Sequence, residues 1–129
     1  MTVYLSIDQV EELHAIQLRH YGGGPGLRDS GGLASAVARP AMTFGGEDLY
    51  PDLASKAAAL MHSLVMNHPY VDGNKRVGAH AAVLFLLINE QRLDATPKEL
   101  EELTLTVAKG ELDAEALAIW FRQRISRED

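Results

Sequence analysis

Helix start and stop signals divide almost the whole chain, and they constrain the fold more than any other feature of the sequence. Capping residues precede runs with apolar residues at helical spacing, and glycine or proline follows most of these runs. Helices are expected over residues 6–21, 29–39, 53–67, 74–89, 96–108 and 113–125. Only residues 3–5 look extended, and one strand cannot form a sheet. The sequence therefore predicts an all-α fold, a compact bundle of about six helices.

One of these segments, residues 74–89, differs from the others in its apolar pattern. From Val77 onward it is apolar nearly all round, whereas a surface helix has one apolar stripe. We therefore expect it to be the central, buried helix of the bundle.

Length and composition limit the class of protein. A chain of 129 residues, 47% of them apolar, fits a single domain over residues 1–129. It contains no cysteine, which excludes disulfides, thiolate catalysis and cysteine-based zinc sites, and agrees with a cytoplasmic location. No signal-peptide pattern is present at the start, and the longest apolar stretch, Val77–Ile88, is too short to span a bilayer. A cytoplasmic protein without a membrane association is expected.

The charge balance argues against nucleic acid as a partner. The formal net charge is −6, and no face collects the lysine and arginine residues that a DNA backbone requires, so no DNA binding is expected. A small anionic ligand needs only a few cations that converge locally. The sequence contains one such place.

Residues 68–76 read His-Pro-Tyr-Val-Asp-Gly-Asn-Lys-Arg and join the end of one expected helix to the start of the next. The start of a helix offers free backbone N–H groups and the positive end of the helix dipole. Gly73 lets the backbone turn tightly and approach a ligand, and Lys75 and Arg76 add positive charge. This segment is therefore predicted to bind a phosphate.

Two further side chains in the segment are suited to catalysis. Histidine titrates near neutral pH, so His68 is a candidate for the base that takes a proton from an attacking hydroxyl. A carboxylate beside phosphates, here Asp72, usually indicates Mg²⁺, which prefers oxygen ligands. A base, a metal and a phosphate site together are typical of phosphoryl or nucleotidyl transfer.

Each residue also has a structural interpretation. Asp72 with Gly73 alone is an ordinary turn, Asn74 alone is an ordinary helix cap, and Lys75 with Arg76 alone is a solvated surface. The combination of all of them at one helix start favours the functional interpretation.

This segment resembles the signature of the Fic/Doc family, which reads His-Pro-Phe-x-Asp/Glu-Gly-Asn-Gly-Arg-x-x-Arg in the Fic branch. The positions that match it are His68, Asp72, Gly73, Asn74 and Arg76.

The segment departs from the Fic pattern at three positions, and two of these departures are informative. Tyr70 replaces the phenylalanine, Lys75 replaces a glycine, and Ala79 replaces the second arginine. The last two resemble the Doc branch, the death-on-curing toxins, whose loop reads His-x-Phe-x-Asp-Ala-Asn-Lys-Arg. Residues 21–26, 84–86 and 103–107 are also similar to Doc segments in the same order, so the resemblance covers nearly the whole chain.

The resemblance implies the Fic/Doc fold and a toxin–antitoxin function. Doc proteins are the toxins of such pairs, and the type member is a kinase that phosphorylates elongation factor Tu and blocks translation; Fic relatives transfer AMP instead. ATP or another nucleoside triphosphate, with Mg²⁺, is thus the expected co-substrate. Fic proteins that restrain themselves carry a Ser/Thr-x-x-x-Glu-Gly/Asn helix, and this motif is missing here because Asp48 follows Thr43 and Glu47. An antitoxin protein on a separate chain is therefore the expected partner.

The resemblance also implies a role for each residue of the loop. His68 is the general base, Asp72 positions Mg²⁺, Asn74 orients a phosphate, and Lys75 and Arg76 neutralise charge on the transferred group. The lysine fills space that glycine leaves open in Fic enzymes, which leads to the hypothesis that the nucleotide binds reversed and offers its γ-phosphate.

The role of His80 stays open at this point. It lies four residues after Arg76, so both are expected on one face of the helix. The Doc prototype has asparagine there. His80 is interpreted either as a donor to a nucleotide phosphate or as a core histidine.

Three alternatives to a Doc-type protein kinase are considered. The first is a Fic-type AMP transferase, which Lys75 and Ala79 disfavour. The second is a non-catalytic protein-binding module, which the intact set of loop residues disfavours. A metal-dependent hydrolase is less favoured still, because the carboxylates and histidines form no cluster of metal ligands.

Overall fold

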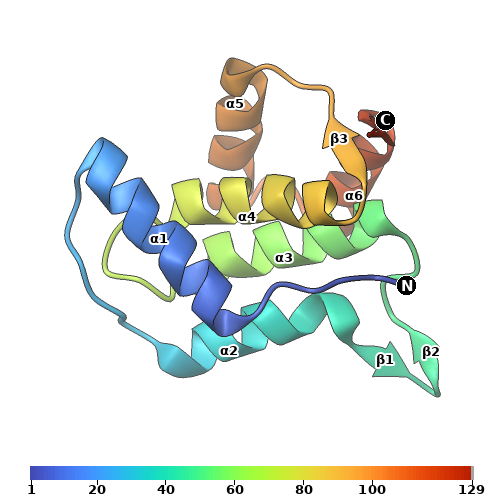
Figure 1. Ribbon diagram of the computed structural model, residues 1–129, viewed down its shortest axis with the longest axis horizontal. Helices are drawn as coiled ribbons and strands as arrows, with labels where there is room; N and C mark the ends of the chain where they lie inside the picture. The colour runs from blue at the N-terminus through green and yellow to red at the C-terminus, as the bar shows by residue number, and fades with distance from the viewer. Residues whose placement is uncertain (129) are drawn as a thin grey trace.

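The computed structural model describes residues 1–128, and these form a helical protein with two small pairs of antiparallel strands (Figure 1). The expected all-α fold is thus confirmed. The α-helices are α1 (Ile7–Tyr21), α2 (Ser30–Ala38), α3 (Leu53–Asn67), α4 (Asn74–Ile88), α5 (Pro97–Ala108) and α6 (Ala114–Arg122). The short elements are the 3-10 helix η1 (Arg39–Ala41) and the strands β1 (Thr43–Phe44), β2 (Glu47–Asp48), β3 (Gln91–Leu93) and β4 (Ile125–Arg127).

Local capping sets the helix boundaries where the sequence predicted them. The Ser6 side chain accepts from the Gln9 backbone N–H at the start of α1, and Gln9 returns the bond. Thr96 and Glu99 form the same reciprocal pair before α5. Each such box satisfies two backbone donors that the helix itself leaves free, so these boundaries follow from a few neighbouring residues.

The centre of the bundle is α3, not α4 as the sequence analysis expected. Residues 54–61 of α3 are buried without interruption, and α3 packs against α2, α4, α5 and α6. By contrast, α4 leaves Lys75, Arg76 and Leu87 exposed. The alanines of α3 let its neighbours approach closely, whereas part of the apolar surface of α4, including Val83, faces a cavity instead of the core.

The expectation of a single extended segment at residues 3–5 was wrong. That segment is not a strand; the Val3 N–H and C=O pair with the Asn89 side chain. The strands lie elsewhere: β1 pairs with β2, and β3 pairs with β4. A Gly45-Gly46 turn joins β1 to β2, and both glycines have the positive φ that a two-residue hairpin of this kind requires.

The last helix is also shorter than predicted. It ends at Arg122, and Ile125 lies in β4 opposite Leu93 of β3. Apolar spacing favoured a helix through Ile125, but pairing with a strand distant in sequence is stronger than that local preference. No helix within residues 1–128 is both long enough and apolar enough to cross a bilayer.

Candidate active site

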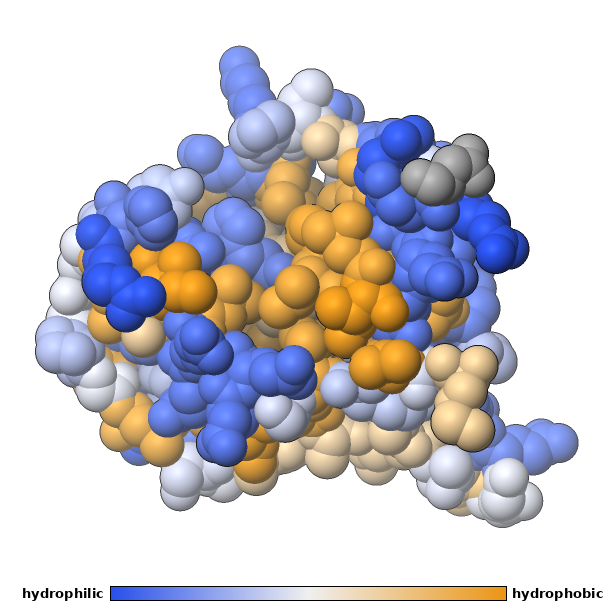
Figure 2. Space-filling view, viewed as in Figure 1, coloured by the Kyte–Doolittle hydropathy of each residue, from blue (hydrophilic) through white to orange (hydrophobic). Residues whose placement is uncertain are grey.

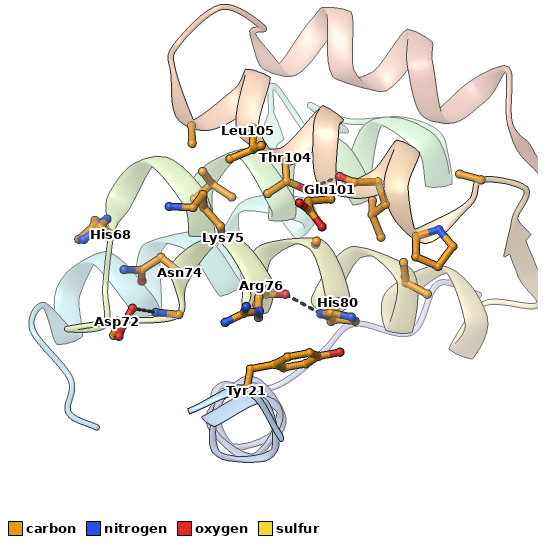
Figure 3. A pocket seen from close by; sticks show the side chains of 18 of the residues that line it. Tyr21, His68, Asp72, Asn74, Lys75, Arg76, His80, Glu101, Thr104 and Leu105 are labelled. Carbon is orange, nitrogen blue, oxygen red and sulfur yellow. Dashed lines mark hydrogen bonds between the residues drawn. The ribbon is translucent and has the colours of Figure 1, made fainter. Parts of the chain in front are cut away.

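A cavity of about 930 Å³ lies between α4, with the loop before it, and α5 (Figure 3). Figure 2 shows apolar side chains in the hollow between α4, α5 and β3. The structure brings every predicted site residue to this one cavity: His68, Asp72, Gly73, Asn74, Lys75, Arg76 and His80.

The start of α4 is the one α-helix start within residues 1–128 without a side-chain cap. Its N-cap residue is Gly73, with φ of 83°, a conformation that residues with a Cβ rarely adopt. The free N–H groups of this first turn therefore remain for a ligand, and the helix dipole favours an anion there. Lys75 and Arg76, both exposed, stand on that same turn.

Asn74 is not the helix cap that its sequence context also allowed. It is 3% exposed, and its side chain pairs with both backbone groups of Tyr70: Oδ1 accepts from N–H, and Nδ2 donates to C=O, each at 2.9 Å. In this structure Asn74 therefore fixes the loop. Its Nδ2 carries a second N–H, which is the donor left for a phosphate.

Asp72 joins two loops through its carboxylate. Oδ1 accepts from the Gly73 N–H at 2.8 Å, and Oδ2 accepts from the Gly24 N–H at 3.2 Å. The bond from Gly24, then that from Gly73, holds the pKa of the Asp72 carboxyl below its usual value, and the charges of the nearby cations act in the same direction. The exposed side chain is thus an anion with lone pairs left for a cation.

His14 supports this loop from α1, a role that its sequence context did not reveal. Its ring is 5% exposed and lies on the Tyr70 ring, with centroids 3.6 Å apart and planes 7° apart. Its Nε2–H donates to the Asp72 carbonyl at 2.7 Å. Burial, and the hydrogen bond that the Tyr70 hydroxyl donates to Glu11, raise the pKa of the Tyr70 phenol.

His80 lies on the cavity wall next to Arg76, as the spacing predicted (Figure 3). Its Nδ1 is 2.8 Å from the Arg76 carbonyl, and since a carbonyl only accepts, Nδ1 carries the proton. Nε2 of the neutral ring is then an acceptor, suited to a hydroxyl or an amino group. Donation to a phosphate requires the protonated ring.

Tyr21 is a residue that the motif analysis did not assign to the site. The Arg76 guanidinium lies 4.4 Å from the centre of its ring, and the ring is 58% exposed at the end of α1 (Figure 3). A cation over an aromatic face is attracted by the ring quadrupole. Tyr21 therefore holds Arg76 on the cavity side. In the sequence, only its place directly before the glycine run distinguished this residue.

Replacing Tyr21 with leucine is expected to weaken the binding of an anion such as ATP at this helix start about 3- to 10-fold, because losing a cation–π contact of roughly 1 kcal/mol frees Arg76. Tyr21→Phe keeps the aromatic face and is expected to stay within about twofold of the unchanged protein. Titration of both variants with a nucleotide measures this. Equal weakening by phenylalanine and leucine contradicts the cation–π role.

The far wall of the cavity comes from α5, whose residues 103–107 are similar to a Doc segment but were not assigned to the site. Its contribution includes the apolar Leu100 and Leu105, the exposed Glu101 and the buried Thr104, whose hydroxyl donates to the Leu100 carbonyl. None of these residues could be assigned to the site from the sequence, because only tertiary packing brings α5 opposite α4.

The geometry defines a helical protein with a cationic, uncapped helix start beside a histidine, and the comparison with known families agrees. Residues 4–86 match the Fic/DOC family, so the chain belongs to that family. The match includes every residue of the predicted site.

Two relatives support the Doc branch of the family for this chain. The chain is 43% identical over 120 residues to "Toxin Doc" of Mycolicibacterium smegmatis, which covers 92% of this chain and 90% of that protein. It is 29% identical over 120 residues to "Protein kinase doc" of Escherichia phage P1, with 93% and 94% covered.

Proposed function

We propose that this protein is the toxin of a toxin–antitoxin pair and transfers the γ-phosphate of a nucleoside triphosphate to a protein hydroxyl. One observation carries the proposal: His68, Lys75 and Arg76 line a single cavity around the only α-helix start of residues 1–128 that lacks a side-chain cap. The two relatives, named as a toxin and as a protein kinase, support the direction of the proposal.

The proposed reaction uses the chain's own groups in a simple order. The imidazole of His68 accepts the proton of a serine or threonine hydroxyl, and the oxygen forms a bond to the γ-phosphorus. The bond from that phosphorus to the β,γ-bridging oxygen breaks, and the nucleoside diphosphate leaves. Lys75, Arg76 and the free N–H groups of α4 stabilise the charge on the transferring group.

Asp72 is the residue proposed to hold Mg²⁺. Within residues 1–128 no three histidine or acidic side chains gather as a ready metal site, which fits an ion that takes one carboxylate and completes its shell with phosphate oxygens and water. When bound, such an ion neutralises phosphate charge.

The partners are proposed from the family resemblance. The target is a translation factor such as elongation factor Tu, and the restraint comes from a separate antitoxin chain. Because a toxin of this kind acts where translation occurs, we propose a cytoplasmic location.

The position of a radioactive label tests the reaction. The purified protein is incubated with bacterial extract, Mg²⁺ and ATP labelled at either the α- or the γ-phosphorus, with His68→Ala as the control. Protein labelled from γ alone supports the kinase, and protein labelled from α indicates AMP transfer and contradicts the proposal. No label from either position, with bound ATP, indicates a binding module.

A further inference from the structure

His68 closes α3 in an unusual backbone conformation. Its φ of 52° and ψ of 54° are left-handed, and it is one of two residues other than glycine with positive φ within residues 1–128. A Cβ makes this conformation costly, so surrounding contacts have to hold it. The direction of the imidazole depends on this backbone, because the side chain leaves from it.

Arg28 supplies those contacts from a loop forty residues earlier. Its Nε donates to the His68 carbonyl at 2.8 Å, and its Nη2 donates to the Asn67 carbonyl at 3.1 Å. These are two of the last carbonyls of α3, which have no partner inside the helix. The planar guanidinium satisfies both at once, and its charge suits the negative end of the helix dipole.

The backbone around Arg28 is itself tied to the catalytic loop. The Arg28 and Asp29 N–H groups both donate to the Pro69 carbonyl, at 2.7 and 2.9 Å, and the Val71 N–H donates to the Gly26 carbonyl at 3.0 Å. The side chain of Arg28 therefore starts from a fixed point. Although the side chain is exposed, its two hydrogen bonds make it a contact between two loops.

We propose that Arg28 is a positioning residue for the transfer reaction: by bonding the Asn67 and His68 carbonyls, it holds His68 in the left-handed conformation that aims the imidazole into the cavity. The inference rests on the proposed function in that His68 is the base. The inference adds Arg28, which lies outside the loop motif, to the site. It also explains why an arginine is suited to this position.

The phosphate side of the site does not depend on Arg28. Asp72 is held by Gly73, Gly24 and His14, and the cations stand on the first turn of α4. Loss of Arg28 is therefore expected to misplace the base and leave nucleotide binding intact. A lower kcat with an unchanged nucleotide KM is therefore the expected signature of this variant.

The test compares Arg28→Ala and Arg28→Lys with Arg127→Ala, a matched loss of an exposed arginine, which forms an ion pair of 3.8 Å with Glu90. Misplaced catalytic groups cost up to about 10²-fold, so Arg28→Ala is expected to lower kcat about 10- to 100-fold with the nucleotide KM within twofold. Lysine reaches one carbonyl, so Arg28→Lys is expected to lie between. Added guanidinium chloride at millimolar concentration is expected to restore part of the Arg28→Ala rate.

A second readout does not require activity. The ¹³Cα and ¹³Cβ chemical shifts of His68 report its backbone conformation, and they are expected to leave left-handed values in Arg28→Ala and keep them in Arg127→Ala. Unchanged shifts overturn the positioning role even where transfer is observed. If the shifts change in Arg28→Ala but the unchanged protein transfers no phosphate, the proposed function is overturned and the contact of Arg28 with the His68 backbone is retained. A kcat loss matched by an equal rise in KM overturns the inference.

Discussion

A His68→Ala variant is expected to transfer phosphate about 10² to 10⁴ times more slowly than the unchanged protein, the range that a positioned general base contributes. The remaining rate comes from the cations and the free N–H groups of α4, which act on the phosphate and not on the attacking hydroxyl. Nucleotide affinity is therefore expected to stay within about threefold, since His68 is exposed and the phosphate contacts are elsewhere.

Two measurements separate these effects: single-turnover transfer from γ-labelled ATP, and calorimetric titration with a non-hydrolysable analogue. His20→Ala is the matched control, because His20 is an exposed histidine of α1 outside the cavity. A His68→Ala variant that keeps its rate removes the base from the proposed reaction. A variant that loses binding and rate together shows that His68 holds the nucleotide instead.

The helices could be predicted from the sequence because their causes are local. The Ser6–Gln9 and Thr96–Glu99 boxes act over three residues, and α3 begins and ends where predicted. The strand pairs could not be predicted in the same way. The pairing of β3 with β4 joins residues more than thirty positions apart, and no local pattern encodes it.

The same division applies to the site. Residues 68–76 form one continuous segment with a recognisable chemistry, so the residues of this cavity wall could be predicted from the sequence. Tyr21, His14 and Arg28 reach that segment from other parts of the chain, and their contacts exist only after folding. The high apolar content of α4 led to the wrong prediction that it is the central helix. The apolar residues of a cavity wall cannot be distinguished by composition from those of a buried core.

Replacing Phe85 with alanine is expected to lower the free energy of unfolding by about 3 to 5 kcal/mol, the largest effect on stability that we predict. Phe85 lies on α4 with none of its surface exposed, and its ring is stacked against that of Tyr4, with centroids 6.2 Å apart. Its removal leaves a cavity in the hydrophobic core that the close packing around it cannot fill. The expected loss is a large part of the total stability of a small domain.

Phe44→Ala makes the same chemical change at the tip of the β1–β2 hairpin, where the side chain is 82% exposed, and is expected to stay within about 0.5 kcal/mol. Urea denaturation followed by circular dichroism measures both variants. A small effect at Phe85 contradicts the packing of α4 against α3. α4 carries the uncapped first turn at one end and Phe85 near the other. Such a result therefore also weakens the placement of Lys75 and Arg76, whose position depends on where this helix packs.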